Sequence, residues 1–267
     1  MDLDWARAGH ERIAVLLHGL EGSSERPYIK GMANTLNEIG WDAVAINFRS
    51  CSGEPNRMAS SYHSGVSFDL VTVLNRVEQE YDTISAVGFS LGGNVLLKHL
   101  GEAGLNTPLI GGVAFSVPCD LRGSSLQLAG TSNKLYMWNF LRLLKAKVET
   151  KAAMFPDLVD ASGFDSITSF QEFDDRYTAP LNGFDSAEDY WSKCSSKSYI
   201  SEIKRPALLV NAADDPFLSE SCYPIEEAKG NPHFTLEIPK YGGHVAFQQP
   251  GKYFWSEERV IDFLSQF

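Results

Sequence analysis

Short runs of apolar and β-branched residues, each followed by a glycine-rich or polar turn, are the feature that most restricts the fold of this chain. The runs do not alternate between apolar and polar residues, as strands with one face in water do. Continuous apolar runs are typical of strands buried on both faces of a parallel sheet. The predicted strands are residues 13–17, 42–48, 84–89, 111–117, 206–212 and 234–238.

Stretches with helical spacing of apolar residues lie between these strands. The stretch 67–81 places Leu70, Leu74 and Val77 on one side of a helix, and Pro27 is suited to the first turn of a helix over 28–39. Further helices are predicted over 92–101 and 256–267. The alternation predicts an α/β fold, with a mostly parallel central sheet flanked by helices.

An early strand is expected to end at 3–5. Because little sequence precedes it, we expect the sheet to be shortened at this N-terminal edge by one strand or two. An exposed edge strand can pair with a second copy of the chain, so a monomer or a weak homodimer is expected.

Residues 119–203 interrupt the alternation, because they contain no convincing buried strand. A helix is predicted over 135–148, followed by a stretch rich in Asp, Phe and Tyr. We therefore expect an α/β core formed by 1–118 and 204–267, with a helical cap or lid inserted at 119–203. The alternative is that this insertion has only a structural role and does not open or close over the site. The aromatic residues of this region, with Trp138 and Trp191, could line an acyl pocket or only pack a core.

The composition excludes several classes of function. The 267 residues carry a formal net charge of -11 and no basic run, which argues against nucleic-acid binding. Cys51, Cys119, Cys194 and Cys222 are scattered without zinc-site spacing, so free thiols and no metal are expected. The N-terminus lacks the features of a signal peptide, and no apolar run could span a bilayer. A soluble, cytoplasmic protein is expected, and membrane contact is possible but not indicated.

The chemistry is indicated first by Gly88-Phe89-Ser90-Leu91-Gly92, which matches G-x-S-x-G. The motif lies at the end of a predicted strand and the start of a predicted helix. In that context the small residues permit a strained turn that exposes the serine oxygen above the sheet. Ser90 is therefore the candidate nucleophile; the alternative is a tight turn with a capping serine.

A serine hydroxyl requires a general base within hydrogen-bonding distance. His244 lies in a glycine-rich loop after the last predicted strand, where this fold brings its base. His10 is near the free end of the chain, His99 is expected on an exposed part of the helix after Ser90, and His233 precedes a strand. His18 is interpreted as a structural loop residue rather than as a second base.

The base in turn requires an orienting carboxylate, and both Asp214 and Asp215 lie between Ser90 and His244 in chain order. Asp215 is preferred because it directly precedes Pro216, which leaves Asp214 as a turn or cap residue. The backbone N–H groups of Leu91 and Leu20 are the predicted oxyanion donors.

Taken together, these stretches resemble the YheT-like branch of the α/β-hydrolases. The resemblance is carried by the stretches 18–23, 47–56, 62–65, 88–98, 214–217, 241–244, 177–180 and 189–191, and it covers nearly the whole chain. It implies a serine esterase or lipase-like enzyme with the triad Ser90, Asp215 and His244, without a cofactor. Relatives usually have glycine at the position of Ser50. Arg49, Glu54 and His63 are polar candidates for holding loops or contacting the substrate.

The sequence thus predicts a serine hydrolase that cleaves small-molecule acyl esters through an acyl-enzyme on Ser90. The same triad would serve an acyltransferase, a thioesterase or a phospholipase. A non-catalytic binding protein on a hydrolase fold is the alternative from another class.

Overall fold

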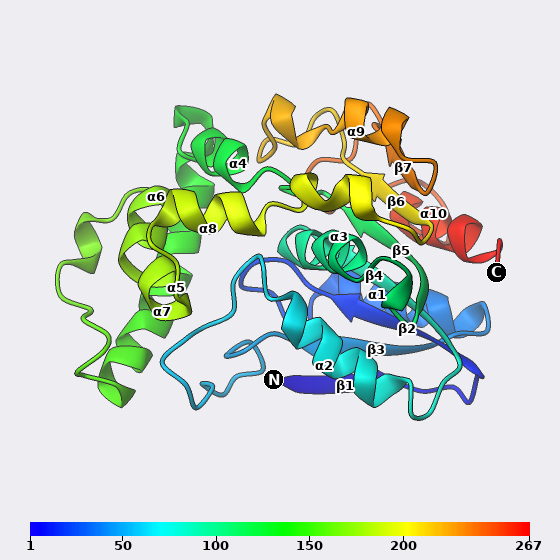
Figure 1. The fold of residues 1–267 in the computed structure, drawn as a ribbon, viewed down its shortest axis with the longest axis horizontal. Coiled ribbons are helices and arrows are strands. Elements are labelled where there is room, and N and C mark those ends of the chain that lie inside the picture. Colours follow the sequence, from blue (N-terminus) through cyan, green and yellow to red (C-terminus); the bar gives the residue numbers. More distant parts are fainter.

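The computed structural model describes residues 1–267, and a seven-stranded sheet forms its centre (Figure 1). The strand order is β1-β3-β2-β4-β5-β6-β7, and only the edge strand β1 runs antiparallel to its neighbour. The strands are β1 (Asp2–Ala6), β2 (Arg12–Leu17), β3 (Asp42–Asn47), β4 (Thr83–Phe89), β5 (Leu109–Phe115), β6 (Ala207–Val210) and β7 (Phe234–Glu237).

Helices cover both faces of this sheet. The helices of the chain are α1 (Pro27–Glu38), α2 (Ser67–Val77), α3 (Leu91–Ala103), α4 (Leu121–Leu128), α5 (Lys134–Met154), α6 (Phe170–Phe173), α7 (Ala179–Asn182), α8 (Ala187–Cys194), α9 (Ile225–Gly230) and α10 (Trp255–Leu264). Apolar side chains of α2 and α3 pack on one face, and those of α1 and α10 pack on the other. Successive residues of β2 therefore contribute to opposite cores, which explains the absence of alternation in its sequence.

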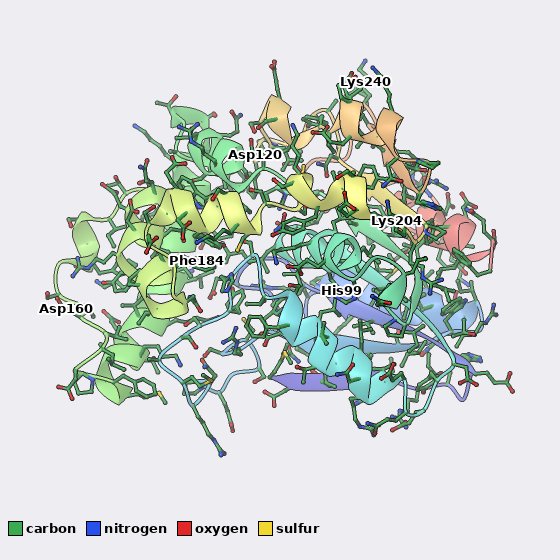
Figure 2. The ribbon with its side chains drawn as sticks, in the orientation of Figure 1. His99, Asp120, Asp160, Phe184, Lys204 and Lys240 are labelled. Carbon is green, nitrogen blue, oxygen red and sulfur yellow. The ribbon has the colours of Figure 1, made fainter.

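The chain between β5 and β6 is helical and contains no strand. Its helices α5 to α7 lie beside the sheet rather than on its faces, in green to yellow at the left of Figure 1. Figure 2 places Asp160 and Phe184 of this segment on the opposite side of the molecule from Lys204 and Lys240. The segment has its own apolar cluster, which includes Leu141, Leu144 and Phe164.

The predicted fold class is confirmed, and each of the six predicted core strands overlaps an observed one. The early strand at 3–5 lies within β1. The helix predicted over 135–148 continues to Met154, because Lys151 is buried and the helix stays packed beyond the apolar pattern. The helix predicted over 67–81 ends at Val77 and gives way to a turn. No helix is both long enough and apolar enough to cross a bilayer.

Gly92, at the start of α3, sets how closely this helix approaches the sheet. A Cβ atom at this position would lie 2.5 Å from the Leu17 carbonyl oxygen and 2.6 Å from that of His18. Both atoms belong to the backbone at the end of β2, so a side chain at Gly92 could not be accommodated by a rotamer change.

We expect Gly92→Ala to destabilise the protein by about 1–3 kcal/mol, because it overpacks two backbones. The measurement is the free energy of unfolding in urea. Gly230→Ala is the matched control, since nothing lies within 4 Å of a Cβ at that position. Equal stability of the two variants would contradict the proposed packing constraint.

Candidate active site

Ser90 occupies the sharp turn between β4 and α3. Its backbone has φ 52° and ψ −119°, a region that residues with a side chain rarely adopt. Gly88 makes the turn possible, because a Cβ there would lie 2.6 Å from the Gly92 carbonyl oxygen and 2.7 Å from Gly93 Cα. The turn raises the serine hydroxyl above the carboxyl ends of the strands.

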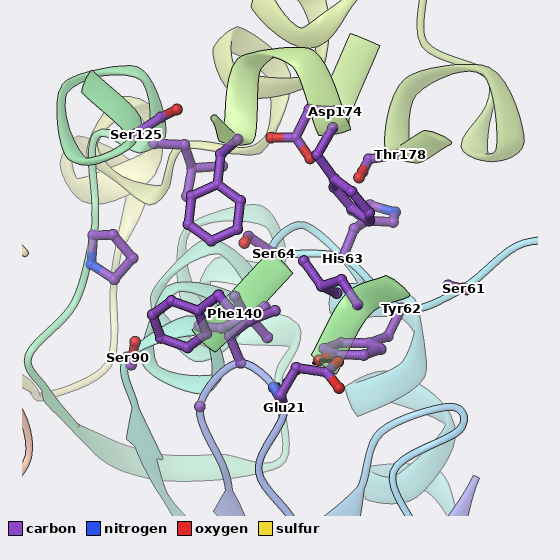
Figure 3. A pocket seen from close by; sticks show the side chains of 18 of the residues that line it. Glu21, Ser61, Tyr62, His63, Ser64, Ser90, Ser125, Phe140, Asp174 and Thr178 are labelled. Carbon is purple, nitrogen blue, oxygen red and sulfur yellow. Dashed lines mark hydrogen bonds between the residues drawn. The ribbon is translucent and has the colours of Figure 1, made fainter. Parts of the chain in front are cut away.

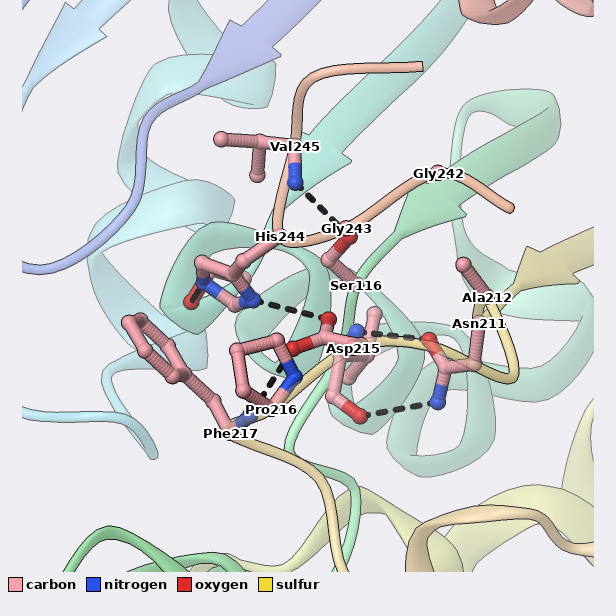
Figure 4. Close-up of polar contacts among 12 residues, drawn as sticks. Ser116, Asn211, Ala212, Asp215, Pro216, Phe217, Gly242, Gly243, His244 and Val245 are labelled. Carbon is pink, nitrogen blue, oxygen red and sulfur yellow. Dashed lines mark hydrogen bonds and ion pairs between the residues drawn. The ribbon is translucent and has the colours of Figure 1, made fainter. Parts of the chain in front are cut away.

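The structure brings the three predicted triad residues together. His244 Nε2 lies 3.0 Å from Ser90 Oγ, and His244 Nδ1 lies 2.9 Å from Asp215 Oδ2. The Asp215 side chain is fully buried, whereas the His244 side chain is 16 % exposed. The other oxygen of Asp215 accepts a hydrogen bond from the Phe217 N–H at 3.0 Å (Figure 4). This arrangement fixes the carboxylate, and through it the plane of the imidazole.

Asp214 and Asp215 have different surroundings. Asp214 Oδ1 accepts hydrogen bonds from the N–H groups of Gly242 and Gly243, at 2.9 and 2.8 Å. It therefore holds the loop that carries His244 and does not contact the imidazole. The Val245 N–H donates to Ser116 Oγ at 3.1 Å and anchors the same loop on its other side (Figure 4).

The backbone N–H groups of Leu20 and Leu91 donate to no other protein group, and both residues line the cavity above Ser90. Leu91 is the first residue of α3, whose N-terminal dipole favours negative charge. Leu20 lies in the loop after β2. Two free donors beside a serine hydroxyl are what an oxyanion requires.

His18 has both ring nitrogens engaged by the backbone. Nδ1 lies 2.7 Å from the Gly19 carbonyl oxygen, and Nε2 accepts from the Phe48 N–H at 3.2 Å. Burial lowers the pKa of His18 to about 4. The ring is therefore neutral at pH 7 and holds the loop that contains Leu20.

The expectation for His99 is wrong. The side chain is buried, and its Nε2 lies 2.9 Å from Thr107 Oγ1. Burial lowers its pKa to about 4. The reason is that η5 (Ser196–Glu202), a helical turn distant in sequence, covers the end of α3 that the helix pattern left exposed.

Arg49, Glu54 and His63 do not form one cluster. Arg49 Nε donates to Asp69 Oδ2 at 3.0 Å beneath the loops, and Glu54 is exposed. His63 alone lines the cavity, with its pKa lowered to about 3 by burial. Ser50 adopts a φ of 64°, the left-handed region in which glycine is at no disadvantage.

A cavity of about 330 Å³ opens at Ser90 and His244, between the sheet and the segment that joins β5 to β6. Trp191 lines it, whereas Trp138 is 60 % exposed and does not. Much of the wall is apolar and comes from Leu121, Leu128, Phe140, Leu144, Val148, Phe170, Phe173, Leu181 and Phe217. This lining suits an alkyl or acyl chain.

Several polar residues of this cavity were not singled out from the sequence, among them Glu21, Tyr62, Lys147 and Asp174 (Figure 3 labels all but Lys147). Glu21 and Tyr62 lie within stretches that carry the family resemblance. Lys147 and Asp174 lie in the inserted segment, where no pattern in the sequence indicated which polar groups face inward.

Asp174 begins a π-helical turn, Asp174–Thr178, and is buried without a basic partner. Its Oδ2 accepts the Trp191 indole N–H at 2.8 Å. Burial raises the pKa of Asp174 from 3.8 to about 7, an effect that hydrogen bonds from Thr178 and Trp191 partly offset. The folded state therefore favours the protonated carboxyl, while the unfolded chain ionises near pH 4.

Because the pKa is raised on folding, Asp174 contributes stability that is lost as the pH rises from about 4 to about 7. Asp174→Asn keeps an oxygen that can accept the indole N–H and cannot ionise. We expect its melting temperature to exceed that of the wild type by several degrees at pH 7.5, and by less at pH 5. If thermal unfolding shows the same difference in melting temperature at both pH values, the raised pKa of Asp174 would be contradicted.

Comparisons with known proteins identify the fold and the family of the chain. Residues 15–250 match the model of the alpha/beta hydrolase fold. The chain is 34 % identical to the protein named "Putative esterase YheT" of Escherichia coli (strain K12), over all of this chain and 82 % of that protein. It is 33 % identical to the human "Phospholipase ABHD3" over 87 % of this chain, which spans only 58 % of that relative.

Solved structures show the same fold. The esterase Pf2001 of Pyrococcus furiosus superposes with a TM-score of 0.64 over 98 % of this chain and 86 % of that one, at 18 % identity. The fold of the chain is thus that of an α/β-hydrolase. The chain belongs to the α/β-hydrolase fold family, and the predicted resemblance to YheT is confirmed.

Proposed function

We propose that this protein hydrolyses carboxylic esters through an acyl-enzyme on Ser90. The observation that carries the proposal is the continuous set of hydrogen bonds from Ser90 Oγ through His244 to the buried Asp215, at the floor of an apolar cavity. The relatives named as an esterase and as a phospholipase support the same class of reaction.

In the first half of the reaction, Ser90 Oγ attacks the ester carbon while His244 Nε2 takes the hydroxyl proton. The N–H groups of Leu20 and Leu91 stabilise the oxyanion, and Asp215 stabilises the imidazolium. The tetrahedral intermediate collapses, and His244 gives its proton to the departing alcohol. Water then attacks the acyl-enzyme with His244 again as the base, and the acid product leaves Ser90 free.

The apolar wall of the cavity supports an acyl substrate with a hydrocarbon chain. Its volume of about 330 Å³ is at the lower end of the usual range for small-molecule sites. A short to medium chain therefore fits better than a long one held entirely inside. The helical segment between β5 and β6 forms most of this wall, so we propose that it acts as a cap over the site.

A phospholipid ester is the second candidate substrate, because the human relative is named a phospholipase. Acyl transfer to an alcohol and thioester cleavage use the same groups.

The four cysteines are unpaired, which supports a reducing, cytoplasmic setting.

We expect the wild type to hydrolyse p-nitrophenyl esters, with its highest kcat/KM between the acetate and the octanoate in a series that extends to the palmitate. Ser90→Ala should lose this activity by a factor of about 10⁶, because no other group supplies the nucleophile. The two proteins should have the same circular dichroism. Failure of a fluorophosphonate probe to label the folded wild type would instead favour a binding protein.

Asp215→Asn should lower kcat by about 10⁴-fold, because the amide favours the wrong imidazole tautomer. The matched variant Asp214→Asn should stay within about tenfold of the wild type, since its amide oxygen can still accept from Gly242 and Gly243. The measurement is kcat on p-nitrophenyl butyrate. A larger loss at Asp214 than at Asp215 would reverse the assignment of the acid.

A further inference from the structure

Glu21 follows the predicted oxyanion donor Leu20 directly, yet it has no role in the reaction described above. Its backbone adopts a φ of 54°, in the left-handed region that disfavours a residue with a side chain. Its side chain is only 6 % exposed. A buried carboxylate with an unfavourable backbone conformation must be held by its surroundings.

The N–H, the carbonyl oxygen and the carboxylate Oε1 of Glu21 all have partners. Its N–H donates to the Tyr62 hydroxyl at 2.8 Å, and that hydroxyl donates to Glu21 Oε1 at 2.7 Å (Figure 3 shows the two side chains together). Arg26 Nη2 donates to the Glu21 carbonyl oxygen at 2.7 Å. The Tyr62 ring stacks on Phe48, whose N–H donates to His18 on the other side of the same loop.

The third partner of Glu21 comes from a distant part of the chain. Lys147 of α5 places its Nζ 2.9 Å from Glu21 Oε1, 3.1 Å from Cys51 Sγ and 5.0 Å from the centre of the Tyr62 ring. The Lys147 side chain is 23 % exposed, so solvent screens the pair only in part. This ion pair connects the helical segment over the cavity to the loop that carries Leu20.

The substrate would contact the same helix. Leu144 and Val148 flank Lys147 on α5 and line the cavity beside Ser90. An acyl chain bound against them would hold α5 against the core, and with it Lys147 against Glu21. The Leu20 N–H lies in the peptide Gly19–Leu20, one residue before the peptide that Glu21 φ turns. A displacement of Glu21 together with α5 would therefore reach this donor by moving Leu20, and so would change the direction of its N–H.

We propose that Glu21 is a positioning residue for the Leu20 oxyanion donor, and that Lys147 makes correct packing of α5 a condition for placing this donor. The inference rests on the proposed function. Glu21 and Lys147 touch no reacting atom, and they act by holding a strained loop in the geometry that the transition state requires. Their removal should therefore weaken binding of the transition state more than binding of the substrate.

The test compares Lys147→Met, Glu21→Gln and Tyr62→Phe with the charge-preserving Lys147→Arg. Lys145→Met is the matched control, since Lys145 lies on the same helix but pairs with the exposed Asp165. For each variant we would measure kcat and KM on p-nitrophenyl butyrate, and the inhibition constant of an alkyl trifluoromethyl ketone. The ketone forms a tetrahedral adduct on Ser90 and needs the oxyanion donors.

Lys147→Met and Glu21→Gln should each lower kcat about tenfold or more and weaken ketone binding by a similar factor, with KM nearly unchanged. Lys147→Arg should keep most of the wild-type kcat and ketone affinity, and Lys145→Met should match the wild type in both. Unchanged ketone binding, or a higher KM at constant kcat, would overturn the inference. In that case Lys147 would only form part of the cavity wall.

The failure of the proposed function would look different. If the wild type cleaves no ester, or if Ser90→Ala keeps the activity, the hydrolase proposal fails. Where the wild type cleaves no ester but still binds the ketone on Ser90, the inhibition constant reports on the loop in the wild type and in each variant. Thermal unfolding identifies a variant that does not fold, and Tyr62→Phe then tests the same loop without removing a charge.

Discussion

The active site depends on the close approach of two backbones at the start of α3. Gly88 and Gly92 leave no space for a Cβ atom, and between them the chain takes Ser90 into a conformation that is unfavourable for it. Burial of the strands and of α3 against each other provides the stability that this turn requires. Every other part of the site is arranged around the position that the turn gives to one hydroxyl.

The architecture was largely predictable because short local sequence patterns indicate its strands and its nucleophile turn. Apolar runs identified the core strands, and G-x-S-x-G between a strand and a helix identified Ser90. The carboxyl ends of parallel strands meet at one edge of a sheet, so loops far apart in sequence had to converge there. The meeting of Asp215 and His244 with Ser90 follows from that rule.

Contacts that depend on tertiary packing were not predictable in this way. His99 was placed on an exposed part of its helix because no local signal indicates that η5 covers it. Lys147 meets Glu21 across more than a hundred residues, and its helix shows no clear division into apolar and polar faces. Asp174 is an ordinary acidic residue in the sequence, and its raised pKa comes mainly from burial in the folded chain. The tertiary packing of the inserted segment determines which of its polar side chains become buried or face the cavity.

The segment over the cavity leaves the sheet after β5 and returns at β6, and these two strands are neighbours. The two strands are parallel, so the segment leaves at the carboxyl edge of the sheet and returns through η5, which packs on α3, to the amino edge. Because η5 contributes Ile200 to the core, the helices before it are the part that can be lengthened, shortened or exchanged while Ser90, Asp215 and His244 keep their places. The length of acyl chain that the cavity accepts can then change while the catalytic residues stay the same, provided that a replacement segment still presents a cation to Glu21. Chimeras that exchange α5 to α7 and keep η5 would be a direct route to new chain-length preferences.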